Sequence, residues 1–279
     1  MSSSGGSASQ GRAFVWGGRS SLAFVFSVPI AVLGGLIGLG GAEFRLPVLV
    51  GPLKHAARQA VALNLTVSLV TIAASLVTRG ATLSLSTVGP LAPDLLALVV
   101  GGVVAAFFGA GWASRFSEAR LRQFILVLLI VIGVALVIEA FLPGDVTGLL
   151  PRDQVIRAVA GLLFGLAIGL FSSMLGVAGG EVTIPTLVFA FGVDIKTAGT
   201  ASLLVSLPTV LTGIGRYARR GAYANRAALT STVVPMAVGS VIGAVLGGLL
   251  VGLVPANILK VGLGLILIWS AQRIFRGAH

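Results

Sequence analysis

Gly38-Leu-Gly-Gly-Ala-Glu43-Phe-Arg-Leu-Pro47-Val-Leu49 recurs 138 residues later as Gly176-Val-Ala-Gly-Gly-Glu181-Val-Thr-Ile-Pro185-Thr-Leu187. The same offset aligns residues 38–79 with residues 176–217 without a gap, and 12 of these 42 pairs are identical. Apolar sequences match easily because they use few residue types, but the shared Glu, Pro, Ser and Thr are harder to obtain by chance. Repeats with helix-breaking residues at matching positions are a signature of secondary transporters.

The composition indicates that lipid is the solvent for most of the chain. Of the 279 residues, 56% are hydrophobic and 10% are charged, whereas soluble domains carry about 25% charged residues. Cysteine is absent and the two histidines are His55 and His279, so we expect no metal site and no cofactor. The basic residues that give the net charge of +11 lie mainly between apolar segments, as the positive-inside rule predicts for a membrane protein. We therefore expect no nucleic-acid partner.

Hydrophobic length divides the chain into eight long segments and two short ones. A straight span needs roughly 20 apolar residues. The long segments cover residues 22–41, 60–77, 95–113, 124–142, 159–178, 198–215, 229–251 and 258–274. The short ones, residues 44–50 and 182–191, are predicted to be broken or re-entrant helices that line a cavity.

We therefore predict an all-α polytopic membrane protein made of two homologous repeats, each with four long helices and one short helix. A disordered cytoplasmic tail covers residues 1–21, the first repeat 22–142, a loop 143–157 and the second repeat 158–279. If the short helices cross, the repeats are inverted; if they re-enter, the repeats are parallel. The inverted arrangement places 13 of the 19 Lys and Arg residues in cytoplasmic loops and the parallel one 11, which favours inversion. Both arrangements place the two termini in the cytoplasm. We expect the protein to lie in the inner membrane of the cell.

The repeated glycines and prolines predict a pair of helix ends that bind an anion. Glycine allows a sharp turn, and proline suits the first turn of a helix, where its missing N–H costs nothing. The free N–H groups of two such ends could clamp one small oxyanion. The predicted contact residues are Gly40, Gly41, Pro47, Gly179, Gly180 and Pro185. The alternative is close helix packing through small residues.

Glu43 and Glu181 are the acidic residues that the two repeats share. An ionisable group inside the membrane is a functional candidate, and each glutamate is predicted either to carry a proton during transport or to cap the short helix. Arg45 has Thr183 in its place in the second repeat. It is predicted to pair with Glu43 or with substrate, or else to lie near the interface.

Each repeat also carries a polar face on its next long helix. Asn64, Ser68 and Thr71 are spaced i, i+4 and i+7, as are Ser202, Ser206 and Thr209, so each set shares one face. Hydroxyl and amide groups can bind an oxyanion without adding charge; the alternative is hydrogen bonding between helices. Four arginines, Arg216, Arg219, Arg220 and Arg226, are predicted to set the topology and to raise the local anion concentration.

At these motifs the chain resembles the TauE/SafE family of sulfite and organosulfonate exporters, also called the toluene-sulfonate uptake permease family. The resemblance rests on the two Gly/Glu/Pro motifs and on the stretches 60–68 and 198–206, and it covers the chain from Val28 onward. The sequence departs from the family pattern at Ala42, Ala178 and Arg45. The resemblance implies transport of sulfite, sulfoacetate or a related sulfur anion.

We expect a secondary transporter of a small sulfur-containing anion, acting as an exporter and driven by protons or by the membrane potential. No Walker motif is present, so ATP is not expected to be the direct energy source. An anion channel and an uptake permease are the alternatives within transport. An enzyme is disfavoured because the spans lack a Ser/His pair and a nucleophilic cysteine. The sequence leaves two further questions undecided: whether the protein is a structural membrane subunit instead of a transporter, and whether it forms a homo-oligomer.

Overall fold

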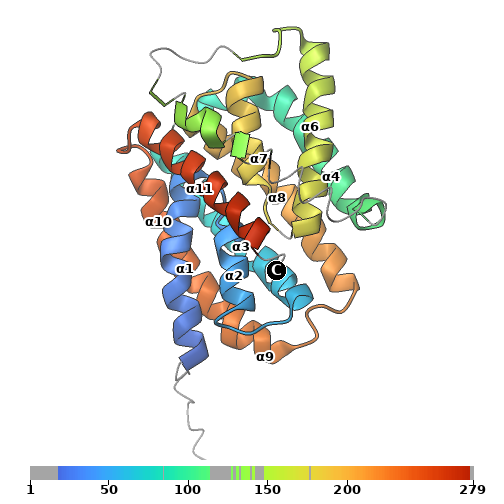
Figure 1. The fold of residues 1–279 in the computed structure, drawn as a ribbon, viewed down its shortest axis with the longest axis vertical. Helices are drawn as coiled ribbons and strands as arrows, with labels where there is room; N and C mark the ends of the chain where they lie inside the picture. The colour runs from blue at the N-terminus through green and yellow to red at the C-terminus, as the bar shows by residue number, and fades with distance from the viewer. Residues whose placement is uncertain are drawn as a thin grey trace, which may run out of the picture.

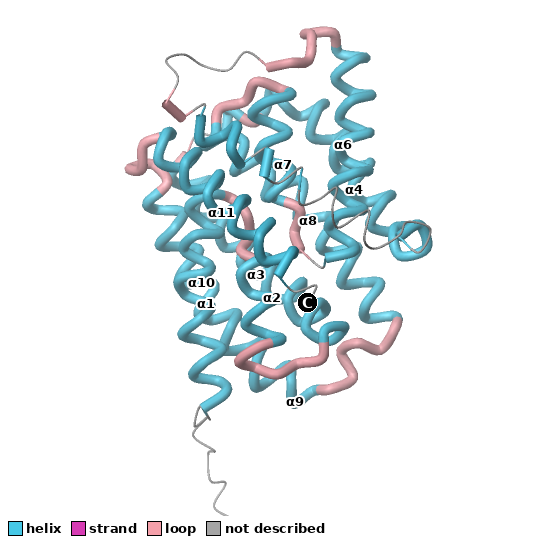
Figure 2. The backbone as a smooth tube through the Cα atoms, viewed as in Figure 1, coloured by secondary structure: helices cyan, strands magenta, loops and turns pink. Residues whose placement is uncertain are grey.

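The computed structural model describes residues 18–83, 85–113, 127, 130–131, 133–138, 140–141, 148–175 and 177–276. Helices and short connections make up this part of the chain, and it contains no strand (Figure 2). The helices that position the site are α1 (Gly18–Ile37), α2 (Ala42–Val50), α3 (Ala57–Thr82), α4 (Ala92–Ala113), α6 (Gln154–Leu175), α7 (Gly180–Pro185), α8 (Ile195–Arg219), α9 (Arg226–Ala228), α10 (Val234–Leu250) and α11 (Ala256–Arg276). A π-helical segment, η3 (Thr186–Ala190), continues α7, and another, η4 (Leu229–Val233), joins α9 to α10.

Six of these helical stretches are long and apolar enough to cross a membrane, which identifies a multi-pass membrane protein. Five of the predicted long segments coincide with α1, α3, α4, α6 and α8, and a sixth with the α9–α10 stretch. Helix α1 begins at Gly18, inside the predicted tail, and α6 begins at Gln154, inside the predicted loop. The tail before residue 18 lies outside the described residues, and the predicted span 124–142 is described in part, at residues 127, 130–131, 133–138 and 140–141.

The two short segments are helices that start directly after a left-handed glycine. Gly41 has φ 73° and Gly179 has φ 82°, a conformation that glycine adopts without the penalty other residues meet. Because the helices begin immediately after these glycines, Pro47 and Pro185 are each the sixth helical residue. The prediction that they occupy the first turn is wrong. Each proline cannot donate to the carbonyl four residues earlier, so the helical ladder is interrupted at Glu43 and at Glu181.

Hydrogen bonds show which helix ends lie together. Arg19 donates to the Leu53 carbonyl (2.6 Å), Ser20 to the Ser231 carbonyl (3.0 Å) and Tyr223 to the Ala62 carbonyl (3.0 Å). The starts of α1, α3 and α10 therefore share one end of the molecule with the end of α8, and we call it the N-terminal end (Figure 1). At the opposite end, Thr82 donates to the Gly248 carbonyl (3.1 Å) and Arg157 to Asp94 (2.5 Å), which gathers the end of α3 with the starts of α4 and α6.

Glycines bring the long helices into close contact across the repeat boundary. Helix α1 runs along α10, and α4 runs along α6. A Cβ at Gly243 would meet the Val28 carbonyl oxygen, and a Cβ at Gly169 would meet the Gly102 carbonyl oxygen, at separations that atoms do not tolerate. Membrane helices associate through such small residues because lipid supplies little hydrophobic drive. Each half of the chain is therefore held by a helix of the other half.

Candidate functional site

The two glycine turns meet at the centre of the molecule. A Cβ at Gly40 would lie 3.6 Å from the Ala178 Cβ, and a Cβ at Gly180 would lie 3.0 Å from the Leu39 Cα. Ser202 on α8 donates a hydrogen bond to the Gly38 carbonyl (2.7 Å). The helices α2 and α7 thus start from two turns in direct contact, with predicted site residues of both repeats side by side.

In the first repeat, Arg45 organises the polar residues. Its side chain is fully buried, which overturns the interpretation of a charge near the interface. One guanidinium nitrogen donates to Ser68 (2.9 Å), and another donates to Thr71 (2.9 Å) and to the Gly40 carbonyl (3.2 Å). Asn64 donates to the Ala42 carbonyl (2.9 Å). The predicted polar face of α3 is therefore committed to holding the first motif.

In the second repeat, the equivalent positions are arranged differently. Thr183, which replaces Arg45, donates to the Gly179 carbonyl within its own turn (2.9 Å), and Thr209 donates to the Val205 carbonyl of its own helix (3.1 Å). The Ser206 hydroxyl is buried and has no hydrogen-bond partner among the described residues. The polar face of α8 therefore carries a buried hydroxyl group that no described residue hydrogen-bonds. Buried polar groups without a partner are rare in native structures unless a ligand or water binds them.

Glu43 and Glu181 lie in the first turns of α2 and α7, and their carboxyl groups are close enough to interact electrostatically. One oxygen of each carboxyl group is buried without a hydrogen-bond partner in the part of the chain that the structure describes. Within those residues, neither forms an ion pair, so the predicted Glu43–Arg45 pair is an electrostatic neighbour and not a salt bridge.

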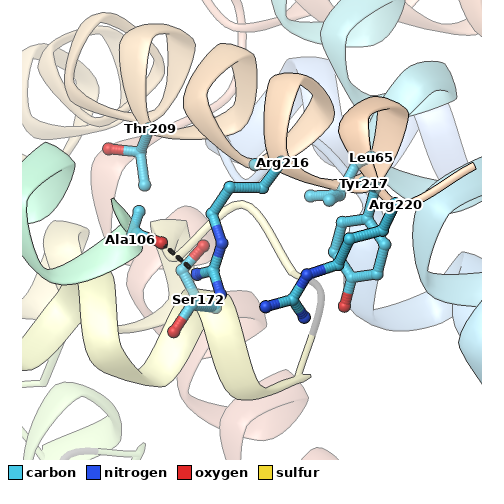
Figure 3. A pocket seen from close by; sticks show the side chains of 9 residues that line it. Leu65, Ala106, Ser172, Thr209, Arg216, Tyr217 and Arg220 are labelled. Carbon is cyan, nitrogen blue, oxygen red and sulfur yellow. Dashed lines mark hydrogen bonds between the residues drawn. The ribbon is translucent and has the colours of Figure 1, made fainter. Parts of the chain in front are cut away.

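A basic pocket opens beside this centre, between α4, α6 and α8 (Figure 3). It encloses about 460 Å³ of empty space, part of it continuous with solvent. Arg216 and Arg220 both direct their guanidinium groups into it, and Arg216 also donates to the Ala106 carbonyl (2.5 Å). The lining consists of Leu65, Ala106, Ser172, Ser173, Thr209, Gly213, Arg216, Tyr217 and Arg220. Two cations beside hydroxyl groups suit a small oxyanion, because guanidinium matches its geometry.

The basic pocket links the N-terminal end to the second motif. On the outer side, Tyr217 and Arg220 also line a groove with Gln59 and Asn225. On the inner side, Ser172 donates to the Val177 carbonyl, directly before the Gly179 turn, and Thr209 belongs to the same α8 face as Ser206. Tyr223 fixes the loop after α8 against α3, and its burial raises the pKa of its hydroxyl. The basic pocket therefore reaches, at Thr209, the face of α8 that also carries Ser206.

Sequence reasoning missed four functional candidates. Arg216 and Arg220 were expected to set topology, yet Thr209, Gly213, Arg216 and Arg220 are spaced as one face of α8, and that spacing was the available signal. Ser172 gave no signal, because a serine in an apolar run is common. Arg79 was not among the predicted site residues, and it is fully buried at the end of α3.

Comparison with known families agrees with this architecture. The family model described as "Sulfite exporter TauE/SafE" matches residues 6–136 and 160–279, which is nearly the whole chain. No curated protein and no solved structure matches it.

Proposed function

Because the chain belongs to the sulfite exporter TauE/SafE family of membrane transporters, we propose that it exports a small sulfur-containing anion such as sulfite, sulfoacetate or another organosulfonate. The observation that carries this proposal is the basic pocket, whose lining includes Thr209 on the same face of α8 as the Ser206 hydroxyl. Arg216 and Arg220 would attract the anion into the pocket. Hydroxyl groups of the protein would then replace the water molecules that hydrate it. The family is made up of transporters and not of enzymes.

We propose further that the two halves are inverted copies. Helices that correspond under the 138-residue offset run in opposite directions: α1 starts at the N-terminal end and α6 at the opposite end, and α3 and α8 differ in the same way. The exchanged packing of α1 with α10 and of α4 with α6 also fits a pseudo-two-fold axis in the membrane plane. The short helices then return to the side from which α1 or α6 started.

The N-terminal end is proposed to face the cytoplasm. Arg19, Lys54, Arg216, Arg219, Arg220 and Arg226 gather there. This concentration of cations is the distribution that the positive-inside rule describes. The basic pocket would then receive the anion from the cytoplasm, as export requires.

The proposed substrate contacts are Ser206 and Thr209 together with Ser202 and the turns at Gly40, Gly41, Gly179 and Gly180, with Pro47 and Pro185 interrupting the helices behind them. Ser68 and Thr71 contribute through Arg45, whose guanidinium they orient, and Asn64 contributes by holding the Ala42 carbonyl. Glu43 and Glu181 are proposed to share a proton, because two carboxyl groups this close in an apolar surrounding are costly when both are charged. Proton movement would then accompany anion movement.

Flux into proteoliposomes tests the function. We expect saturable uptake and counterflow of radiolabelled sulfite or sulfoacetate, responsive to a pH gradient. Glu181→Gln is expected to transport without that pH response, because the amide cannot exchange a proton. Absence of flux for every sulfur anion, with or without a gradient, would reject the proposal, and an ohmic current without counterflow would indicate a channel instead.

A further inference from the structure

The basic pocket has a counterpart in the first repeat that is closed. Four of its α8 residues, Thr209, Gly213, Arg216 and Tyr217, correspond to Thr71, Ser75, Thr78 and Arg79 on α3. The α8 positions border an open cavity, whereas the four α3 positions are all buried. Around them, a Cβ at Gly248 would lie 2.9 Å from the Thr78 Cβ, so α10 packs directly against these α3 positions. Among the described residues, the α8 positions therefore border an open pocket towards the N-terminal end, and the equivalent α3 positions towards the opposite end are closed.

Arg79 lies at the point of closure. Added Cβ atoms at Gly38 and Gly199 would lie 2.6 and 2.7 Å from one of its guanidinium nitrogens, so the group is wedged between the first motif and the start of α8. Within the described part of the chain, its one side-chain hydrogen bond is long, from Nη2 to the Leu36 carbonyl (3.4 Å). Its Nε and Nη1 atoms are buried without a hydrogen-bond partner among the residues described. A buried guanidinium with two unused donors is costly, and it would gain strongly from an anionic acceptor.

We propose that Arg79 is the gate of the end opposite the basic pocket, and that its unused donors bind a small oxyanion when that end opens. The proposal rests on the proposed transport function and on the inverted repeat. Inverted halves can exchange conformations, so that the first half becomes open as the second half closes. In that second state, Arg79 would border an open pocket, as its counterpart Tyr217 and the neighbouring Arg216 do in the present state. The contrasting possibility is that Arg79 only fills space between two glycines.

The absence of cysteine in the chain allows accessibility to be measured with single introduced thiols. The matched positions are Gly213→Cys in the basic pocket and Ser75→Cys at its closed counterpart. Each variant is reconstituted and treated with a membrane-impermeant thiol reagent from either side. We expect the Gly213→Cys thiol to react from the side of the N-terminal end alone, and the Ser75→Cys thiol to react from neither side.

Arg79→Gln is then added to both single-thiol variants. It is expected to make the Ser75→Cys thiol reactive from the opposite side and to reduce labelling of the Gly213→Cys thiol. Lys196→Gln serves as the control, because Lys196 is a cation of the same end that binds the Gly252 carbonyl and not the glycine wedge. Labelling that rises at both positions, or at neither, would overturn the gate. If Arg79→Gln does not fold, the same test uses saturating sulfite on protein with Arg79 intact, where reciprocal changes support the gate and unchanged labelling overturns it.

Anion binding by Arg79 has its own readout. The apparent KM for sulfite supplied from the opposite side is expected to rise about tenfold or more in Arg79→Gln, as befits one lost charged hydrogen bond, and to be partly rescued by Arg79→Lys. The KM from the side of the N-terminal end should stay within about twofold. Equal changes on both sides would show that Arg79 acts only as packing. Thiol labelling needs no flux, so a failed gate and a failed transport function give different results.

Discussion

The polar faces of α3 and α8 have the same hydroxyl spacing but different environments. On α3, Ser68 and Thr71 each accept a hydrogen bond from Arg45. On α8, the equivalent Ser206 has no partner among the described residues and Thr209 lines the basic pocket, while Thr183, in place of that arginine, bonds within its own turn. In the proposed account, the exchange of Arg45 for Thr183 leaves the Ser206 hydroxyl of α8 available to a ligand. In this account, one copy of the repeat stabilises the fold and the other supplies the proposed substrate site.

Removal of the arginine should have the largest effect. Arg45→Leu leaves Ser68, Thr71 and the Gly40 carbonyl without their donor in a buried position, and we expect a loss of about 3 kcal/mol or more in stability. Thr183→Ala, the matched change in the second repeat, removes one hydrogen bond and should cost about 1 kcal/mol. Thermal unfolding in detergent, followed by tryptophan fluorescence, measures both. Equal losses would contradict the division between the repeats.

The two left-handed glycines should rank next. Gly41→Ala would place a Cβ 3.0 Å from the Ile30 carbonyl oxygen, whereas the Cβ of Gly179→Ala lies 3.8 Å from the equivalent Ile168 oxygen. Left-handed strain costs about 1–2 kcal/mol in both, and the backbone clash adds to it at Gly41. We expect a lower melting temperature for Gly41→Ala than for Gly179→Ala. Gly215→Ala, which meets no atom within 4 Å, is the control and should be no less stable than the parent.

Serine substitutions separate the two polar faces by stability. Ser68→Ala removes an acceptor of a buried guanidinium and is expected to cost about 1.5–3 kcal/mol, the range for hydrogen bonds to charged groups. Ser206→Ala removes a hydroxyl without a hydrogen-bond partner in the described structure and should leave the melting temperature nearly unchanged. A large loss at Ser206 would mean that this hydroxyl serves the scaffold.

Helix caps give the smallest expected difference. Asp194 caps α8 by accepting from the N–H groups of Lys196 and Thr197, and its counterpart Ala56 begins α3 with a similar backbone conformation and no side-chain cap. Asp194→Ala should cost about 1 kcal/mol, and Ala56→Asp should recover up to a similar amount. The double exchange is expected to stay close to the parent melting temperature. A gain at Ala56 larger than the loss at Asp194 would show that the starts of the two helices are not comparable.

The sequence predicts the elements of this molecule better than their contacts. Hydrophobic length and the repeated Gly/Glu/Pro motif locate the short helices 42–50 and 180–190 to within two residues, because these signals are local. The placement of Pro47 failed because the helix start is fixed by the left-handed Gly41, and glycine conformation is not encoded by composition. Arg45 and Arg79 appear as ordinary charges in the sequence, since burial depends on which helices cross them.

The most direct test of transport through the second repeat is sulfite counterflow in proteoliposomes for the parent, Ser206→Ala and Ser240→Ala. Ser240 is the control, because its buried hydroxyl likewise has no partner among the described residues and lies on α10. The predicted result is an apparent KM for sulfite about tenfold higher in Ser206→Ala, as expected for one lost hydrogen bond to an anion, with Ser240→Ala matching the parent. Parent-like counterflow in Ser206→Ala, or a similar loss in both variants, would contradict the account.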